Sequence, residues 1–430
     1  MTVIVAGPAP VLGQERLTLA DAMARARTAT PAARALAAGA QEAEARVVQA
    51  RAGYLPRVDV TQSVERGDQP VFVFGSLLAQ RRFSVANFDI AALNQPPATT
   101  NIRTALTVDH TVFDGDRTRL AARSAALGGE LANLEQARVG QDLALAAAQA
   151  FVRVLQLEAV LQAADAAVAA AASDIERARA RRDVGLATDA GVLAIEVHLA
   201  DVQQRHITAL GDLAIARLAL NDAIGLPLDQ PVTLVRPVPR AGSAASAALT
   251  TEALAARAER QQADLRTRVA ETDRRREQAA FLPTLRVQGG WEFNGNSWFD
   301  QRAAWLVGAR LQVNIFNGFA DNARLAEARQ AEVRAAAERD RVMGQIAVDV
   351  RSALARLDTA RARDTAGRAA LSQAREAQRI IRDRYETGLA TVTDVLRAAE
   401  AVVDADARAT AAEMDVILQD VALDRALGRL

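Results

Sequence analysis

The sequence of 430 residues contains no cysteine and no lysine. Without cysteine, these residues form no disulfide, no thiolate metal site and no cysteine-linked lipid anchor. The 52 basic residues, all arginine, balance 52 acidic residues, so the formal net charge is zero. A neutral chain gives no electrostatic reason to expect nucleic acid as a partner.

Aromatic residues are also scarce, at 4% of the chain, although half of the residues are hydrophobic. Alanine supplies most of the apolar share, and charged residues recur between the alanines with helical periodicity. This composition favours long helices packed closely side by side over a compact core of large side chains. No apolar run reaches the roughly 18 residues of a membrane-spanning helix, so we expect no helix of that kind.

The first residues, MTVIVAGPAPVLGQ, are apolar and end in small side chains, but they lack the basic region that opens a secretory signal. We predict that residues 1–16 are the remnant of a signal peptide or a disordered segment. The structured chain is then expected to begin at Leu17.

The rest of the chain is two copies of one plan, recognisable by repeated motifs. RRDVGLATDAGVL, which contains Gly185, returns as RYETGLATVTDVL, which contains Gly388, 203 residues later. TVFDG, ending at Gly115, returns as NIFNG, ending at Gly318, with the same offset. A YLP motif precedes the first of these turns and an FLP motif precedes the second. We therefore predict an internal two-fold repeat.

The motifs set the boundaries of the two copies. We predict repeat 1 over residues 17–225, a proline-rich linker over 226–248 that belongs to an equatorial region, and repeat 2 over 249–430. The offset is 227 residues at the YLP and FLP motifs but 203 afterwards, so the first copy carries 24 extra residues. They lie within Gln69–Asn101, which we expect to form a surface loop.

Two segments without proline are predicted to form very long helices, from about residue 116 to 183 and from about 320 to 385. At 1.5 Å per residue, each would span about 100 Å. Small residues along one side and charges on the other indicate coiled-coil-like packing.

The segments between the LP and F-[DN]-G motifs alternate with a period of two, and we predict β-hairpins at about 57–113 and 284–316. In TLRVQGGWEFNG, the apolar side chains that share one face are Leu285, Val287, Trp291 and Phe293. Segments of about 10 to 14 residues match a tilted membrane-crossing strand. An ordinary hairpin with one wet face is the alternative, but charged residues that alternate with tryptophan favour a barrel with a polar lumen.

Four strands cannot close a barrel alone, and open strand edges are not tolerated in lipid. Several protomers must therefore contribute hairpins to one barrel. Three protomers would supply twelve strands, an even number within the bacterial range.

The duplicated order of LP, F-[DN]-G and glycine motifs over Leu17–Leu430 resembles the TolC-type outer-membrane efflux proteins, or outer membrane factors. The resemblance implies a mainly α-helical fold with β-structure. The family forms a homotrimer with a twelve-stranded β-barrel, four strands per protomer, continued by a long α-helical barrel through the periplasm.

The resemblance also assigns a role to the glycine turns. They would be the periplasmic tip at which the duct docks onto an adaptor protein, through Gly185, Leu186, Gly388 and Leu389. Glycine is needed there because a turn after a helix uses a residue with positive φ. A C-cap glycine without docking is the simpler alternative.

The periplasmic gate, by resemblance, contains Asp394 and Tyr385. Three copies of Asp394 would form a carboxylate ring, and Tyr385 would hold the closed state through hydrogen bonds; a helix-capping role is the alternative for Asp394. Ala390 and Arg397 depart from the family, so the resemblance implies neither an arginine lock nor a second acidic ring. In the first copy, Asp189 is expected to be an exposed N-cap, with partner contacts as the alternative.

The function implied by the resemblance is a passive, gated exit duct of a tripartite efflux or type I secretion system, in the outer membrane of a Gram-negative bacterium. Its partners would be outer-membrane lipid, a periplasmic adaptor (membrane fusion protein) and an inner-membrane transporter. No phosphate loop, nucleophile elbow or zinc signature occurs, so we expect no enzymatic activity, cofactor or metal site. A periplasmic coiled-coil adaptor or structural protein and a monomeric porin are the alternatives, which the duplicated hairpins and the four strand candidates disfavour.

Overall fold

A computed structural model describes residues 15–184, 188–238 and 246–430. The chain divides into two units, which we describe separately. The helical unit contains residues up to 40, 133–263 and 339–430, and the sheet unit contains residues 41–132 and 264–338. Four helices contribute residues to both units.

The described helices are α1 (Leu19–Thr28), α2 (Pro31–Arg51), α3 (Pro70–Ala79), α4 (Ile90–Asn94), α5 (Arg117–Asp183), α6 (Asp189–Ala223), α7 (Ser246–Ala256), α8 (Ala258–Gln278), α9 (Ala320–Glu386) and α10 (Val392–Leu427). The strands are β1 (Glu15–Leu17), β2 (Arg57–Gly67), β3 (Thr99–Phe113), β4 (Val232–Leu234), β5 (Thr284–Gly295) and β6 (Gln301–Gln312). Short 3₁₀ turns occur at η1 (Ala52–Tyr54), η2 (Val85–Phe88) and η3 (Ala279–Phe281).

The duplication predicted from the motifs is visible in the helices. Helices α5 and α9 each have 67 residues, and they begin and end within one residue of the predicted positions. Helices α6 and α10, which follow them, have 35 and 36 residues. The turns before α5 and α9 also share one geometry, because Gly115 and Asp116 in the first copy, like Gly318 and Phe319 in the second, have positive φ.

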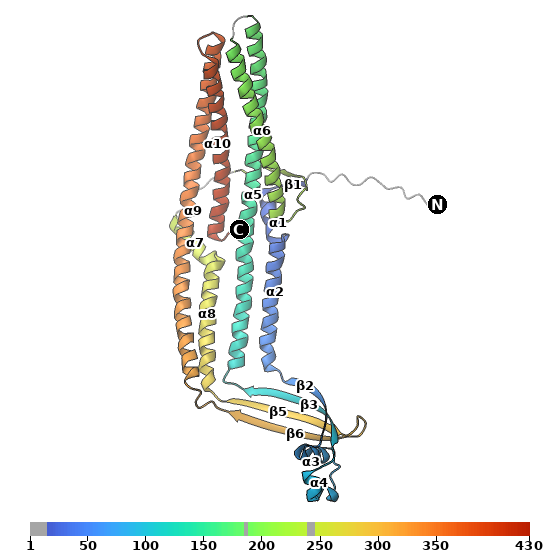
Figure 1. Cartoon of the computed structure of the whole chain (residues 1–430). Helices are drawn as coiled ribbons and strands as arrows, with labels where there is room; N and C mark the ends of the chain where they lie inside the picture. The colour runs from blue at the N-terminus through green and yellow to red at the C-terminus, as the bar shows by residue number, and fades with distance from the viewer. Residues whose placement is uncertain (1–14, 185–187, 239–245) are drawn as a thin grey trace, which may run out of the picture. The chain divides into compact units, whose positions relative to one another are not determined.

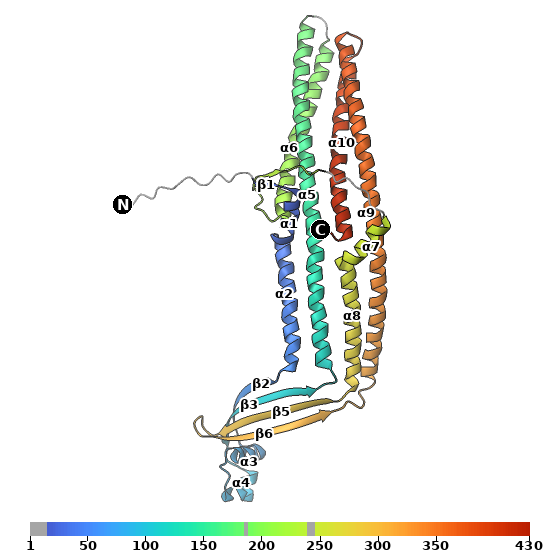
Figure 2. The same ribbon diagram turned by 180° about the vertical axis from the view of Figure 1, so that it is seen from behind.

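The sheet unit is built on four antiparallel strands in the order β2-β3-β5-β6, which run side by side in both views of Figures 1 and 2. The first hairpin, formed by β2 and β3, lies within the predicted range. The second is shorter than predicted, because β6 ends at Gln312 and not near residue 316. Among the described residues, β2 and β6 each have a paired strand on one side only.

The sheet has one apolar and one polar face, as the alternating pattern predicted. Trp291 on β5 lies opposite Trp305 on β6, and Leu285 lies opposite Leu311. These side chains share the apolar face, and Trp305 is 72% exposed. On the other face, the Arg103 Nε atom lies 2.6 Å from a Glu292 carboxylate oxygen. The apolar face is thus open and hydrophobic, while the polar face carries ion pairs.

The segment Gln69–Asn101, expected to be a surface loop, instead contains α3, η2 and α4. Pro70 occupies the first turn of α3, where its missing N–H costs no helical hydrogen bond. The side chain of Asp89 accepts a hydrogen bond from the Ala91 N–H and caps α4. These capping residues convert a proline- and asparagine-rich insertion into helices, which corrects the prediction.

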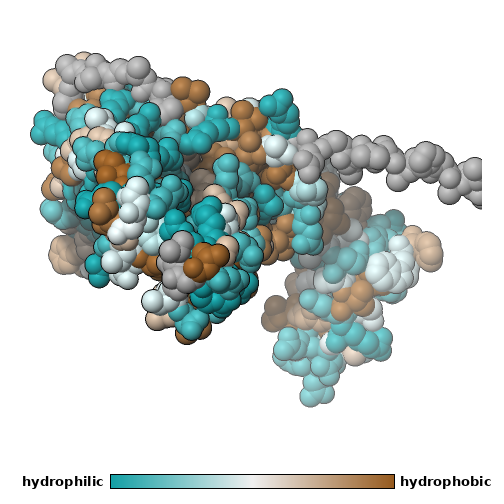
Figure 3. All heavy atoms as spheres, turned by 90° about the horizontal axis from the view of Figure 1, so that it is seen from above, coloured by the Kyte–Doolittle hydropathy of each residue, from teal (hydrophilic) through white to brown (hydrophobic). Residues whose placement is uncertain are grey.

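The core of the helical unit is built from small side chains around a few large ones. Phe151 on α5 and Leu220 on α6 are fully buried, and Ala22 and Ala26 of α1 pack into the same cluster. Leu17 joins this cluster from β1, which pairs in parallel with β4. Hydrophilic residues cover most of the surface in Figure 3, with hydrophobic patches between them.

Two boundary predictions need correction. Residues 15 and 16 belong to β1 and not to an irregular segment ending at residue 16, because β4 supplies a strand partner from the linker. The linker predicted at 226–248 contains β4, and α7 begins at residue 246. Residues 1–14, on which the signal prediction rests, lie outside the described residues.

Helix α5 corrects the expectation that no helix could cross a membrane. By length and composition, α5 contains one segment apolar enough to do so. A buried core helix meets the same criterion. Ala147, Phe151 and Val154 of α5 pack into the core of the helical unit, although only 39% of the apolar segment is buried.

A buried ion-pair network joins four helices of the helical unit. Glu259 on α8 accepts a hydrogen bond from Arg257 at 2.9 Å and another from Arg425 on α10 at 2.8 Å. Arg257 also pairs with Asp349 on α9, and Arg425 with Asp142 on α5. Burial alone would raise the pKa of Glu259, but the hydrogen bonds from the two arginines lower it to about 2.

We expect Glu259→Gln to destabilise the helical unit by about 2 kcal/mol at pH 7. The variant loses a carboxylate whose pKa is about 2 in the folded protein instead of 4.5. Solvent screens this carboxylate only in part, so most of the pKa difference contributes to stability. The ionised carboxylate stabilises the fold above pH 4.5, and this contribution is lost as the pH falls from 4.5 toward 2. Chemical unfolding of both proteins should therefore show a constant difference between about pH 5 and 8 that shrinks at lower pH.

The matched control is Glu176→Gln, since that carboxylate pairs with Arg179 on the surface and its side chain is 73% exposed. It should change the unfolding free energy by less than about 1 kcal/mol. Equal effects of the two substitutions would show that the network does not hold the helices together.

Candidate gate and docking turns

The turn between α9 and α10 is closed by a glycine in the left-handed conformation. Gly388 has φ of +78°, and its N–H donates to the Tyr385 carbonyl at 3.1 Å. The next N–H, of Leu389, donates to the Arg384 carbonyl at 2.7 Å. These two bonds form a Schellman motif, which satisfies carbonyls at the end of α9 and favours glycine at position 388 because of its positive φ. The side chain of Leu389 is 70% exposed beside it.

Helix α10 begins with a capping box formed by Thr391 and Asp394. One Asp394 carboxylate oxygen accepts the Thr391 hydroxyl at 2.7 Å and the Thr391 N–H at 2.9 Å. In return, the Asp394 N–H donates to the Thr391 hydroxyl oxygen at 3.3 Å. The capping alternative for Asp394 is therefore realised in the single chain.

Capping also favours the ionised form of Asp394. The pKa of this exposed carboxyl is lowered, first by the Thr391 hydroxyl, then by the Thr391 N–H, and further by the positive charges of Arg397 and Arg384. Asp394 is thus held as an anion at the turn. Arg397, which departs from the family pattern, helps to keep it so.

Tyr385 contacts the other helical hairpin through a cation–π interaction. The guanidinium carbon of Arg181 on α5 lies 4.9 Å from the centroid of the Tyr385 ring. Among residues 15–184, 188–238 and 246–430 of the single chain, the Tyr385 hydroxyl has no hydrogen-bond partner, so the hydrogen bonds of the closed state that the resemblance implies stay a prediction. The ring face, and not the hydroxyl, makes the contact that the structure shows.

The first copy of the turn is capped differently. Thr188 is the N-cap of α6, and its side chain accepts a hydrogen bond from the Gly191 N–H at 3.2 Å. Asp189 is the first helical residue and not the N-cap that we expected, because Thr188 occupies that place. Gly191 stands where the second copy has Asp394, so the first cap has no carboxylate to return the bond. Gly185 and Leu186 lie outside the described residues.

An apolar contact and a small cavity lie next to these turns. Val392, the first residue of α10, packs against a cluster from the first copy that comprises Ile175, Ala178, Val192 and Ile195. A cavity of about 110 Å³ is lined by Ala178 and Ile195 of this cluster and by Arg181, Tyr385 and Val395. The two hairpins therefore touch through aliphatic side chains as well as through the cation–π pair.

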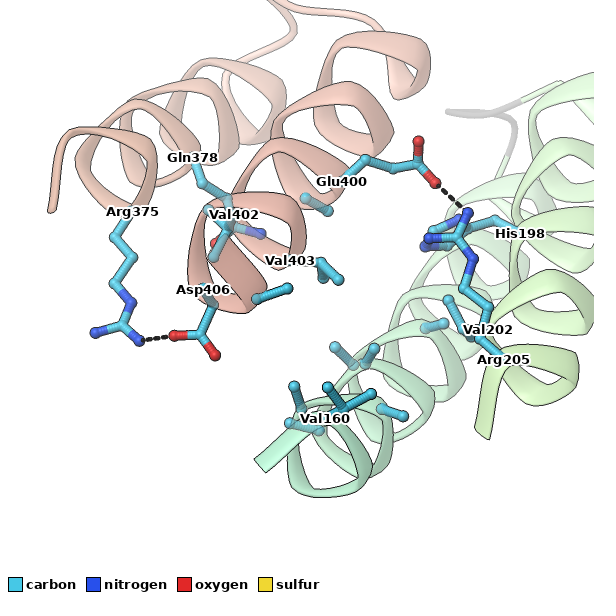
Figure 4. Close-up of a pocket in the computed structure, with 18 of the residues that line it drawn as sticks. Val160, His198, Val202, Arg205, Arg375, Gln378, Glu400, Val402, Val403 and Asp406 are labelled. Atoms are coloured by element: carbon cyan, nitrogen blue, oxygen red, sulfur yellow. Dashed lines mark hydrogen bonds and ion pairs between the residues drawn. The ribbon is translucent and has the colours of Figure 1, made fainter. Parts of the chain in front are cut away.

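Further along the hairpins, a larger cavity of about 370 Å³ lies between α5, α6, α9 and α10. Figure 4 shows Val160, Val202 and Val403 along it, with an ion pair between Arg205 of α6 and Glu400 of α10. The Arg205 Nη2 atom lies 3.1 Å from the Glu400 Oε1 atom. This ion pair, like the contact between Arg181 and Tyr385, joins the first repeat of the chain to the second.

The sequence model of the outer membrane efflux protein family matches residues 22–226 and 249–429. The chain belongs to this family. Membership confirms the predicted resemblance, the outer-membrane localisation and the role in efflux. The two matched ranges are close to the repeats predicted at 17–225 and 249–430.

Known proteins support this assignment over nearly the whole chain. This outer membrane efflux protein is 24% identical over 425 residues to the outer membrane efflux protein BepC of Brucella suis biovar 1. The aligned region covers 96% of this chain and 86% of BepC. Its fold is similar to that of VceC from Vibrio cholerae, with a TM-score of 0.79, 19% identity, and 95% and 96% of the two chains covered. The CmeC channel of Campylobacter jejuni gives a TM-score of 0.82 at 13% identity, with 100% of this chain and 93% of CmeC covered.

Sequence analysis of this efflux protein missed the partner threonines and the bridging arginines. Thr188 and Thr391 are 203 residues apart, the repeat offset, so the duplication itself could have identified them as paired N-caps. No sequence pattern identifies Arg181 as the partner of Tyr385, because the contact joins helices that are far apart in the chain.

We expect Thr391→Ala to destabilise the first turn of α10 by about 1 kcal/mol, because the variant loses the N-cap hydroxyl. Amide hydrogen exchange measured by mass spectrometry should then be about fivefold faster in the peptide that begins at Val392. Thr208→Ala is the control, since the Thr208 hydroxyl bonds the Gln204 carbonyl in the middle of α6. Unchanged exchange after loss of Thr391 would show that the capping box does not stabilise this turn.

Proposed function

We propose that three copies of this chain form a gated exit duct of a tripartite efflux or type I secretion system. The observation that carries this proposal is the two-faced, four-stranded sheet with an open edge on β2 and another on β6. Each copy would pair its β2 with β6 of a neighbour, and three copies would close a twelve-stranded barrel.

The need for several copies of the chain follows from the lipid that would surround the sheet. Lipid offers no hydrogen bonds, so each unpaired backbone group in a membrane costs several kcal/mol. Strands β2 and β6 have 11 and 12 residues, which suits a tilted crossing of the bilayer. Pairing between copies satisfies both edges at once, whereas a single chain would leave both unpaired.

One face of the sheet would contact lipid, and the other would contact water. The apolar face, with Trp291, Trp305 and Leu311 exposed, suits contact with outer-membrane lipid. The polar face, with the Arg103–Glu292 ion pair and with Arg286 and Arg310, suits a water-filled lumen. Substrate would pass along this polar face.

The periplasmic gate would lie at the α9–α10 turn. Three Asp394 carboxylates around a three-fold axis would form an acidic constriction that binds cations. The Arg181–Tyr385 pair and the packing of Val392 would hold the second hairpin against the first in the closed state. Opening would break these contacts.

Exposed tip residues would dock the periplasmic adaptor. Leu389 projects beside Gly388, and the repeat places Leu186 and Gly185 at the equivalent positions of the first copy. The adaptor would connect the duct to an inner-membrane transporter that supplies the energy. We propose no catalytic step, no cofactor and no nucleic acid partner for this chain.

We expect Asp394→Asn to weaken the block of conductance by divalent cations at least about tenfold in planar bilayers, because the substitution removes the three carboxylates of the ring. Asp189→Asn is the matched control, because this acid begins α6 in the first copy. It should leave the block unchanged.

Two outcomes would contradict the gate. Equal cation block in the wild type and in Asp394→Asn would remove the acidic ring from the proposal. The same loss of block in Thr391→Ala, which keeps the carboxylate but breaks the capping box, would assign the effect to the cap and not to the charge.

A further inference from the structure

Two arginines of the sheet differ from the others because they have no partner. The remaining four arginines on the strands each contact a polar side chain, in the pairs Arg57–Asp59, Arg66–Thr100, Arg103–Glu292 and Arg302–Asp300. Arg286 on β5 and Arg310 on β6 form no hydrogen bond or ion pair within residues 15–184, 188–238 and 246–430. Their guanidinium groups are therefore open to a ligand.

The register of the sheet places these two arginines side by side. Arg286 and Arg310 are directly opposite each other on β5 and β6, and both residues are exposed. The Cβ atoms of directly opposed residues in an antiparallel pair lie about 5 Å apart, and two like charges at such positions destabilise the sheet. An anion bound between the two guanidinium groups would offset this repulsion.

A hollow of about 540 Å³ lies beside the two arginines, which are part of its lining. Gly290 of β5 and Gly308 of β6 also line it, and they share the face of the arginines because an even number of residues separates them along each strand. A Cβ atom at position 290 would lie 2.7 Å from the Leu106 carbonyl oxygen, so the neighbouring strand leaves no room for a side chain there. The hollow therefore gives a bound molecule space next to the arginines.

The other charged groups that line the hollow leave it positive. Arg103 and Glu292 neutralise each other in their ion pair. Asp109 on β3 lines the hollow as well, and its carboxylate forms no hydrogen bond or ion pair within the described part of the chain. One carboxylate beside two unpaired arginines leaves an excess of positive charge. Guanidinium groups bind carboxylate and phosphate through paired N–H donors, so the site has the chemistry to bind an anion.

We propose that Arg286 and Arg310 bind the carboxylate or phosphate group of a water-soluble molecule that the duct transports. The binding site lies within one chain and does not depend on how copies assemble, whereas its role in transport rests on the proposed function. Lipid is not the expected source of the anion, because the two arginines lie on the polar face of the sheet and the exposed Trp305 lies on the other. The transported molecules would then include anionic compounds.

Binding can be measured on the full-length protein in mild detergent with para-fluorobenzoate, whose fluorine resonance broadens when the molecule is bound. Arg310→Gln should weaken binding at least about fivefold, because it removes one of the two guanidinium donors. Asp109→Asn should strengthen binding about twofold, because it removes the unpaired carboxylate beside the site. Arg302→Gln is the matched control, since Arg302 lies on the same face of β6 but is paired with Asp300. It should leave the affinity unchanged, and the neutral para-fluorobenzamide should not bind.

Equal weakening in Arg310→Gln and Arg302→Gln would assign the attraction to net charge and overturn the inference. Displacement of the probe by dihexanoyl phosphatidylglycerol at a lower concentration than by inorganic phosphate would make lipid the source of the anion and overturn it as well. Native mass spectrometry of the same samples separates this inference from the proposed function. Three chains without binding would overturn the anion site and leave the duct intact, whereas one chain that still binds the probe would support the site and contradict the duct.

Discussion

The unpaired edges of the sheet, on β2 and β6, are the constraint on which the rest of the structure depends. A four-stranded sheet with an apolar face is stable in a membrane only when both edges find hydrogen-bond partners. The chain belongs to a family of outer membrane efflux proteins, and in the proposed duct the sheet would meet this condition. Copies of the same chain would satisfy it symmetrically, and their polar faces would then enclose one lumen.

The duplicated helices supply a similar scaffold twice, but the two turns have diverged. Both copies begin the returning helix with a threonine cap, at Thr188 and Thr391. Only the second adds a carboxylate, Asp394, where the first has Gly191. The same second turn carries Tyr385, whose ring lies against Arg181 of the first hairpin. The second repeat therefore provides Asp394 and Tyr385, and the first provides Arg181, which contacts the Tyr385 ring.

The sequence predicted the features that follow from local periodicity and from repetition. The limits of α5 and α9 follow from proline-free helical patterns, and the faces of β5 follow from strict alternation. The fold of α3 was missed because PVFVFGSLLA lies between proline- and asparagine-rich stretches that usually form loops. The Arg181–Tyr385 contact and the network around Glu259 could not be predicted, because each joins residues that only tertiary packing brings together.

In the proposed duct, copies of the chain close the open edges of the sheet. Native mass spectrometry of the protein extracted from outer membranes in mild detergent tests it most directly. We expect a particle of three chains that persists on dilution. A particle of one chain, carrying an intact four-stranded sheet, would contradict it.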